Sequence, residues 1–292
     1  MDWHSRRISS ILENALLEDK ATSDATSRAC IDAQQRATAT ILAKQECVLA
    51  GVGAVARILE IYEQLDREAI GHPEVISHGE IFDGVRLHKG QAIAVVRHNA
   101  RVLLCCERVI LNVLQRLSGI ATYTRQFVDA IHGTNARILD TRKTVPGLRV
   151  LDKYAVRCGG GHNHRLDLSD GMLLKNNHVA LAGSLSAALQ KALRNRRSEM
   201  PVEVEVRNMQ ELEEALSNGA ERIMLDNMTV EQVKNAVARI RTHSHPVPIE
   251  VSGGIRLDNV RAYAETGVDY ISVGALTHSP PAVDLSMRIV PA

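Results

Sequence analysis

A set of charged residues in the second half of the chain could bind and process an anionic substrate. Each lies at or next to the end of a short apolar segment: they are Arg142, Lys143, Lys175, Glu205 and Asp226. Lysine and arginine pair with carboxylates and phosphates, and carboxylate oxygens suit Mg²⁺. Several cations beside two carboxylates therefore indicate a polyanionic substrate that is bound together with a divalent metal ion.

Two glycine-containing turns follow the last two apolar segments. They are Ser252-Gly253-Gly254 and Gly274-Ala275. Backbone N–H groups at such a turn can approach a phosphate closely where a helix begins. A glycine pair after a strand is often only a turn, but its position after the last two strands of a βα barrel is where phosphate is commonly bound. We therefore predict a phosphate site at these turns.

The segment Gly159–Arg165 reads Gly-Gly-Gly-His-Asn-His-Arg. Its glycines permit backbone conformations with positive φ, and the guanidinium of Arg165 has the planar shape that pairs with a carboxylate. His162 and His164 could face the same way in a strand and hold a metal ion. No third ligand stands out nearby, so a metal site is not favoured. A further histidine, His178, fits a structural and a functional role equally well.

An alternation of short apolar segments and amphipathic helices must position these residues. Helical periodicity extends over Gln210–Leu216, Val230–Ile240 and Asp258–Ala264. Strands that alternate with helices form βαβ units and a parallel sheet, which predicts a compact βα barrel or an open relative of one. The carboxyl ends of barrel strands meet at one mouth, so the charged residues and both turns would converge. The predicted strands are Ala136–Leu139, Met172–Leu174, Val202–Val206, Ile223–Leu225, Ile249–Val251 and Tyr270–Val273.

The first part of the chain has a mixed pattern of helices and strands, and its character changes near residue 115. A long helix is predicted from Asn99, with an interruption at Ser118-Gly119 before a second helix that ends near Ile131. The other predicted elements are a helix over Arg6–Leu17 and strands over Ala37–Ala43 and Gln91–Val96.

The composition argues against nucleic-acid binding and against insertion into a membrane. The 292 residues include 35 Lys and Arg against 34 Asp and Glu, and only 3% are aromatic. Nucleic-acid binders usually show a basic excess or exposed stacking rings. The longest apolar run, Val48–Leu59, is interrupted by Arg57 and is too short to span a bilayer.

The cysteines and the N-terminal residues indicate a cytoplasmic protein. The five cysteines include no Cys-x-x-Cys pair, so neither a disulfide framework nor a structural zinc site is predicted. Adjacent Cys105 and Cys106 lie in an apolar helical stretch and are interpreted as core residues. The first residues lead into an amphipathic stretch rather than an apolar signal segment.

Several motifs closely resemble those of quinolinate phosphoribosyltransferases. The resemblance covers nearly the whole chain, with the motifs in the same order. The segments that carry it are Glu107–Asn112, Gln115–Thr122, Asp140–Arg149, Gly159–Arg165, Leu225–Met228, Glu250–Ile255 and Val273–Ser279.

The resemblance implies an α/β fold with an N-terminal α/β sandwich domain over residues 1–115 and an incomplete, open βα barrel over residues 116–279. A C-terminal helix over residues 280–292 is expected to pack on the first domain. A homodimer or higher oligomer with shared active sites is also implied. The implied reaction transfers a phosphoribosyl group from phosphoribosyl pyrophosphate to quinolinate. Its products are nicotinate mononucleotide, pyrophosphate and CO₂, as a step of NAD biosynthesis.

The resemblance also implies a role for each matching site residue. Mg²⁺ would be held by Glu205 and Asp226, directly or indirectly, and these two carboxylates with Lys143 and Lys175 would be catalytic. The residues implied to bind quinolinate are Arg108, supplied by a partner chain, and Arg142, His164, Arg165 and Lys175. The residues implied to bind phosphoribosyl pyrophosphate are Lys143, Glu205, Asp226, Ser252, Gly253, Gly254, Gly274 and Ala275. The role of His278 is left open.

Two departures from the family pattern are visible. Lys175–His178 reads Lys-Asn-Asn-His where the family usually has Lys-Asp-Asn-His, and Ser23–Thr26 replaces a usual Gly-Asp-x-Thr. Neither change affects a residue to which chemistry is assigned, so they bear on rate or affinity more than on the type of reaction.

Three other functions remain open at this point. The first is a related phosphoribosyltransferase that accepts a monocarboxylate such as nicotinate, or a paralogue from metal-transport operons. The number of cations favours the dicarboxylate. The second is an aldolase that forms a Schiff base at Lys175. The third is a catalytically silent binding or regulatory protein, which is disfavoured because an unused cluster of buried cations is costly to maintain.

Overall fold

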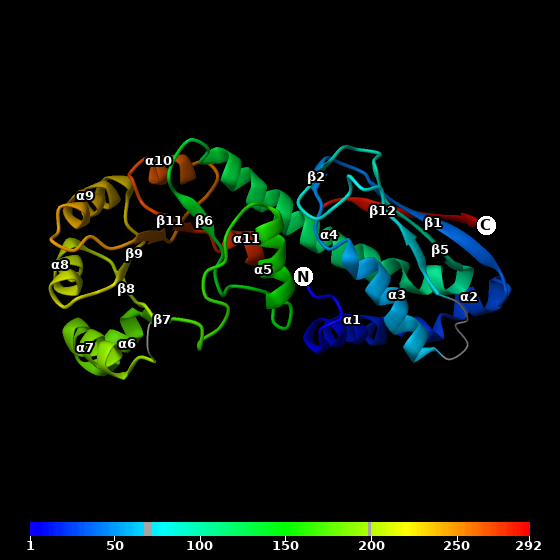
Figure 1. The fold of residues 1–292 in the computed structure, drawn as a ribbon, viewed down its shortest axis with the longest axis horizontal. Helices are drawn as coiled ribbons and strands as arrows, with labels where there is room; N and C mark the ends of the chain where they lie inside the picture. The colour runs from blue at the N-terminus through cyan, green and yellow to red at the C-terminus, as the bar shows by residue number, and fades with distance from the viewer. Residues whose placement is uncertain (67–71, 198–199) are drawn as a thin grey trace. The chain divides into compact units, whose positions relative to one another are not determined.

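The computed structural model describes residues 1–66, 72–197 and 200–292. The chain forms two compact units (Figure 1). The first unit comprises residues 1–125, 144–160 and 279–292, and the second comprises residues 126–143 and 161–278. The predicted boundary near residue 115 falls inside one long helix, α4 (Ala100–Ala130), which contributes to both units.

The first unit is built on an antiparallel sheet of four strands in the order β12-β1-β5-β3. Along β1 (Arg36–Ala43) buried and partly exposed side chains alternate, as the two-residue period of a strand requires. The helices α1 (Arg6–Glu18) and α3 (Gly53–Leu65) pack against each other. The remaining elements of this unit are η1 (Ala21–Ser23), α2 (Ala25–Cys30), β2 (Cys47–Val48), β3 (Glu74–Ile76), β4 (Arg86–Leu87), β5 (Ala92–Asn99), α5 (Arg149–Cys158) and β12 (Leu285–Pro291).

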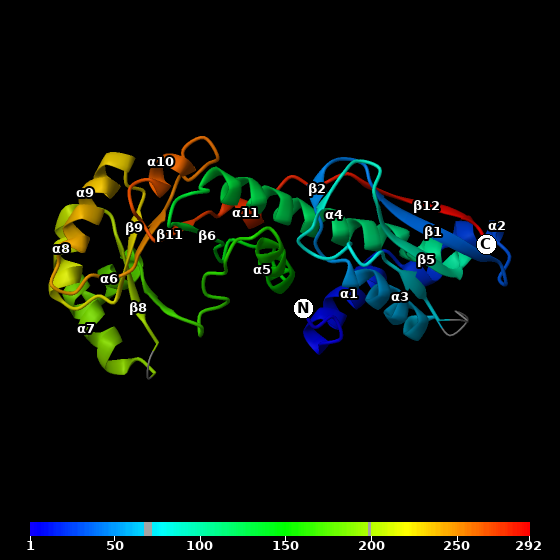
Figure 2. The ribbon, with the colours of Figure 1, turned by 45° about the horizontal axis from the view of Figure 1, so that its top comes forward.

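The predicted C-terminal helix over residues 280–292 is wrong. This segment contains the strand β12, which pairs antiparallel with β1, from Ala43 opposite Leu285 to Ala37 opposite Pro291. This segment belongs to the first unit. Figure 2 shows β12 beside β1. The physical reason is that the N–H and C=O groups along the edge of β1 need partners, and an extended segment supplies them.

The predicted interruption of the long helix at Ser118-Gly119 is also wrong. α4 runs without a break through both residues, because each has a packing role. The hydroxyl of Ser118 accepts a hydrogen bond from the N–H of Ala50 at 3.0 Å. A Cβ on Gly119 would collide with the backbone of Pro281. This glycine therefore allows close approach of another segment and does not end the helix.

The second unit contains an all-parallel sheet in the order β6-β11-β10-β9-β8-β7. β6 and β7 are the two edges of the sheet, so the predicted open βα barrel is confirmed. All six predicted strands are present, as β6 (Arg137–Leu139), β7 (Met172–Leu174), β8 (Val202–Val206), β9 (Arg222–Asp226), β10 (Ile249–Ser252) and β11 (Tyr270–Ser272). The helices are α6 (Asn176–Ala182), α7 (Leu185–Asn195), α8 (Met209–Ser217), α9 (Val230–Arg241), α10 (Val260–Ala264) and α11 (Ala275–His278).

The strand β8 shows how this sheet positions polar groups. Its valines and its two glutamates, Glu203 and Glu205, alternate along the strand and so lie on opposite faces. The helices α7 and α8 lie beside β8 on the outer side of the sheet, as Figures 1 and 2 both show. Both glutamates are buried, and their partners, described below, lie on the inner side.

Cys105 and Cys106 are core residues, as predicted. Both are buried on α4, and all five cysteines of the chain are free thiols. Within the described residues, no helix combines the length and the apolar character needed to cross a membrane.

Candidate active site

A cavity of about 760 Å³ lies at the carboxyl ends of the strands of the second unit. This is the end at which βα barrels build their active sites. Nearly all of the predicted site residues line it, namely Arg142, Lys143, His164, Arg165, Lys175, Glu205, Asp226, Ser252, Gly253, Gly254, Gly274 and Ala275. The convergence expected from the parallel strands is therefore found in the structure.

Arg108 is the predicted site residue that does not line this cavity. It lies exposed on α4, in the part of the helix that belongs to the first unit. The resemblance assigned it to the partner chain, so its contribution to the site stays a prediction.

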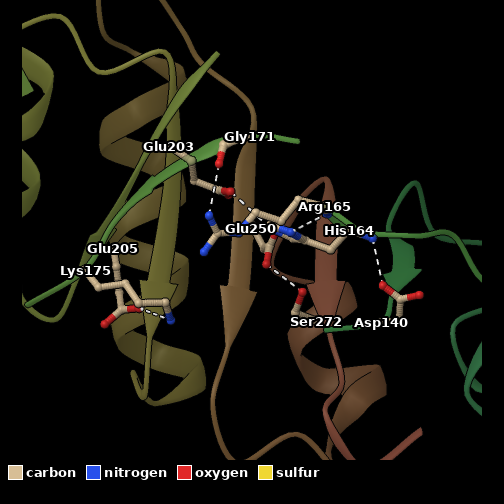
Figure 3. A network of polar contacts seen from close by, with 9 residues as sticks. All are labelled: Asp140, His164, Arg165, Gly171, Lys175, Glu203, Glu205, Glu250 and Ser272. Carbon is tan, nitrogen blue, oxygen red and sulfur yellow. Dashed lines mark hydrogen bonds and ion pairs between the residues drawn. The ribbon is translucent and has the colours of Figure 1, made fainter. Parts of the chain in front are cut away.

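Lys175 and Glu205 form an ion pair in the cavity wall (Figure 3). The Nζ of Lys175 lies 3.1 Å from Oε2 of Glu205, and 48% of the lysine side chain is exposed. Lys175 is also the N-cap of α6, and its backbone N–H donates to Nδ1 of His178 at 3.0 Å. His178 thus has a structural role: it holds the turn that presents Lys175 to the cavity.

His164 lies between two buried carboxylates (Figure 3). Its Nε2 is 3.1 Å from Oε2 of Glu203 and 3.4 Å from Oε2 of Glu250. Burial alone lowers the pKa of His164, but the interactions with these two carboxylates outweigh this effect and raise the pKa to about 9. The backbone N–H of Arg165 donates to Nδ1 of His164 at 2.7 Å, and this hydrogen bond opposes protonation of Nδ1. The two carboxylates prevail, because hydrogen bonds between charged partners are about twice as strong as neutral ones.

These contacts complete a group that the sequence did not reveal. Glu203 is a barrel-wall residue that pairs with His164. Together with Glu250 it supplies the nearby ligands that were missing when a metal site at the histidines was set aside. The three ligand atoms lie within 4.8 Å of one another. A metal ion needs a neutral imidazole, so the raised pKa of His164 opposes metal binding there.

Asp140 holds the backbone at His164 in place. This carboxylate is completely buried and accepts hydrogen bonds from the N–H of His164 at 2.9 Å and from Nδ2 of Asn163 at 2.5 Å. Two residues before His164, the N–H of His162 donates a hydrogen bond to the carbonyl of Ile138 at 2.8 Å. The segment after the three glycines therefore runs beside β6 like a short additional strand.

Arg142 and Arg165 bring two positive charges together in the cavity. Burial and then the charge of Arg142 lower the pKa of Arg165. One guanidinium N–H of Arg165 donates to the carbonyl of Gly171 at 3.0 Å. Within the described part of the chain, the buried Nε of Arg142 has no hydrogen-bond partner. Two adjacent guanidinium groups with unused donors favour an anionic ligand.

Asp226 lies on the other side of the same cavity. Its pKa is raised by burial and by the negative charge of Glu205, against the opposing effect of a hydrogen bond from Asn227 at 2.7 Å. Two carboxylates that repel each other in this way would be stabilised by a divalent cation between them.

The glycine turns have the conformations that a close backbone approach requires. Gly253 has φ +93° and Gly254 has φ +66°, both in the region that favours glycine. A Cβ on Gly274 would lie 3.1 Å from Cδ of Lys143 and 3.3 Å from the ring of His278. His278, whose role was left open, therefore belongs to the wall of this cavity.

Replacing Gly253 with alanine is expected to destabilise the second unit more than replacing Gly254. A Cβ at position 253 would collide with the side chain of Asn227 and lie 2.9 Å from its backbone nitrogen, whereas a Cβ at position 254 meets nothing within 4 Å. Both variants carry the cost of a positive φ, about 1–2 kcal/mol, and only the first adds overpacking of about 1–3 kcal/mol. Thermal denaturation compares the two; equal midpoints would show that the contact with Asn227 is unimportant.

Both halves of the chain match known family models. The model for the C-terminal domain of quinolinate phosphoribosyl transferase matches residues 120–288, and the model for its N-terminal domain matches residues 24–118.

Similar proteins are found from several bacteria. The nicotinate-nucleotide pyrophosphorylase (carboxylating) of Mycobacterium leprae is 43% identical over 279 residues, which are 95% of each chain. A probable enzyme of the same name from Bacillus subtilis is 42% identical over 97% of this chain and 93% of its own. The crystal structure of NadC from Streptococcus pyogenes matches with a TM-score of 0.92 and 37% identity, over 100% of this chain and 99% of that one.

A more distant structure shares the fold alone. Human nicotinic acid phosphoribosyltransferase matches with a TM-score of 0.63 at 14% identity, over 94% of this chain and 74% of that one. The family matches span both units, the bacterial relatives align over nearly their full lengths, and all of the predicted site residues except Arg108 line one cavity. The chain belongs to the quinolinate phosphoribosyltransferase family.

Proposed function

We propose that this chain transfers the phosphoribosyl group of phosphoribosyl pyrophosphate to quinolinate and releases pyrophosphate and CO₂, with nicotinate mononucleotide as the product. This is a step in the synthesis of NAD. The names of its full-length relatives support the assignment. The observation that carries it in this molecule is the distribution of charge in the cavity, with crowded cations on one side and paired carboxylates on the other.

The cationic side suits a dicarboxylate. Arg142 and Arg165 repel each other, and His164 and Lys175 add positive charge to the same cavity. A planar acid with two carboxylates offers each guanidinium an acceptor and relieves their repulsion. Nicotinate, with one carboxylate, would leave part of this set unpaired, which favours quinolinate.

The acidic side suits Mg²⁺. Glu205 and Asp226 supply carboxylate oxygens, and the pKa of Asp226 is already raised by burial and by its neighbour's charge, so the residues fit the ion. When bound, the ion would supply positive charge for the leaving pyrophosphate. Lys143 and Lys175 add to that charge, and the glycine turns at Gly253 and Gly274 offer backbone N–H groups to the 5′-phosphate.

The reaction needs no nucleophilic side chain. The pyridine nitrogen attacks C1 of the ribose as the bond to pyrophosphate breaks. The positive charge that the ring nitrogen acquires stabilises the electron pair left on the neighbouring ring carbon when its carboxylate leaves as CO₂, and that carbon then takes up a proton from solvent. The cavity's task is to hold the two substrates in line and to balance their charge.

A single assay tests the reaction. The protein is incubated with phosphoribosyl pyrophosphate, Mg²⁺ and either quinolinate or nicotinate, and nicotinate mononucleotide and CO₂ are followed together. We expect equal amounts of both products with quinolinate and no product with nicotinate. Product from nicotinate alone would move the assignment to a monocarboxylate enzyme. Irreversible inactivation by borohydride with a carbonyl substrate would indicate an aldolase, because the proposed reaction forms no imine.

The proposed assembly is a homodimer or higher oligomer in which Arg108 reaches the site of a partner chain. Mixing inactive Arg108→Ala and Lys175→Ala proteins tests this arrangement. If each site combines residues of two chains, hybrid dimers contain one intact site. Activity should then return to about a quarter of the wild-type value after subunits exchange. No recovery, with exchange verified by differently tagged chains, would show that Arg108 does not act in a partner's site, and a fully active Arg108→Ala protein would place it outside the site altogether. The cytoplasmic location stays a prediction.

A further inference from the structure

Two buried carboxylates converge on one histidine inside the barrel. Glu203 on β8 is 4% exposed and Glu250 on β10 is completely buried. Their Oε2 atoms lie 3.1 and 3.4 Å from Nε2 of His164. Figure 3 shows the ring between them, with Ser272 donating from its hydroxyl to Oε1 of Glu250 at 2.6 Å. Neither glutamate lines the substrate cavity, whereas the histidine does.

These carboxylates are poorly explained as core packing. In the described part of the chain, Oε1 of Glu203 and Oε2 of Glu250 are buried and accept no hydrogen bond by distance and angle. Glu250 forms an ion pair with His164 at 3.4 Å. Buried charges with unused acceptors destabilise a fold, and apolar residues of similar volume would often be more stable. Their presence therefore points to a function that needs negative charge behind the cavity wall.

The placement of Glu203 follows a pattern along its strand. Glu203 and Glu205 lie on the same face of β8, two residues apart. Glu205 pairs with Lys175, and Glu203 pairs with His164. Each inward carboxylate of β8 therefore holds one cation of the set that is predicted to bind quinolinate.

We infer that Glu203 and Glu250 are positioning residues, which fix the ring and the positive charge of His164 at the cavity wall and thereby set the affinity for quinolinate. The inference rests on the proposed function. The backbone of the same histidine is held by Asp140, so its side chain and its main chain are both anchored. The two glutamates act through His164 and do not contact the substrate.

Replacing Glu250 with glutamine tests the inference. The amide keeps the shape of the side chain and can still accept from Ser272, but it removes the charge that favours the imidazolium. We expect the KM for quinolinate to rise about tenfold, because hydrogen bonds to charged groups carry effects of that order. The KM for phosphoribosyl pyrophosphate and kcat should stay within about twofold. Calorimetric titration with quinolinate alone should show the same loss of affinity without turnover.

A double-mutant cycle separates positioning from a general structural role. If Glu250 acts through His164, then E250Q should cause no further loss in a H164N protein. A similar rise in the KM for quinolinate in both backgrounds would overturn the inference. E203Q should behave like E250Q, since both contact the same ring nitrogen.

Two further variants keep the outcomes distinct. E213Q is the matched control, because Glu213 pairs with Arg239 on α9 and does not line the cavity; its KM values should be those of the wild type. If E250Q fails to fold, S272A removes the hydrogen bond that orients Glu250, and a smaller rise in the KM for quinolinate is expected. Because Ser272 also lines the cavity, this rise must disappear in the H164N background if it acts through Glu250. An inactive wild type would refute the proposed function, whereas an active wild type with unchanged quinolinate binding in E250Q, E203Q and S272A would refute the positioning role alone.

Discussion

Replacing Lys175 with alanine is expected to lower kcat/KM by a factor of about 100 to 1,000, the usual effect of removing a preorganised group that stabilises developing charge. The ammonium group of Lys175 lies in the cavity, 3.1 Å from Glu205. Its loss removes a cation from the substrate site and leaves the carboxylate of Glu205 unpaired, where it would repel both anionic substrates. Steady-state kinetics with each substrate varied in turn measures the effect.

The control for this variant is Lys234→Ala. Lys234 is exposed on α9 and does not line the cavity, so its activity should be that of the wild type. Thermal denaturation of both proteins verifies that they are folded. The variants Arg142→Ala and Arg165→Ala should lose activity as Lys175→Ala does. Near-normal turnover in all three would mean that the reaction takes place elsewhere.

Replacing Asp226 with asparagine is expected to lower kcat about a hundredfold and to raise the Mg²⁺ concentration needed for half-maximal activity by about tenfold or more. The amide has nearly the same shape but no charge, so the cavity keeps its volume and loses one of the two carboxylates that fit the ion. Activity measured over a range of Mg²⁺ concentrations tests both effects.

The same substitution should leave the protein as stable as the wild type or more stable. Burial and the charge of Glu205 both raise the pKa of Asp226, so its ionised form is disfavoured in the folded protein. Removing that charge relieves the repulsion. A raised thermal midpoint together with low activity would separate a loss of function from a loss of folding. Asp284→Asn, at an exposed position outside the cavity, is the control. An unchanged Mg²⁺ requirement in Asp226→Asn would exclude Asp226 from the metal site.

The local elements of the second unit were predictable because each depends on neighbouring residues. The strand β8 is recognisable from its valines at every second position, and α9 from apolar residues at helical spacing. The gathering of Lys175 and Asp226 in one cavity was also predictable, because parallel strands of a barrel share one carboxyl end.

The errors arose where packing with a distant segment decided the local structure. Gly119 and its neighbour suggested a break, but the glycine makes room for the backbone of Pro281 and the helix continues. The last residues were expected to be helical and instead complete a sheet beside β1. In both cases the deciding partner lies far away in the sequence, so that no local pattern records it.

What the sequence by itself determined was the family, the alternation of strands and helices, and the set of side chains that lines the cavity, because these follow from motifs and from the short periods of helices and strands. Only the tertiary structure decided which of those side chains are partners. His164, Glu203 and Glu250 come from three separate segments, and they meet because the sheet order puts β10 and β8 on either side of β9 with their inward side chains facing one interior. The charge of a buried histidine depends on such neighbours and on its burial, and both are properties of the folded chain.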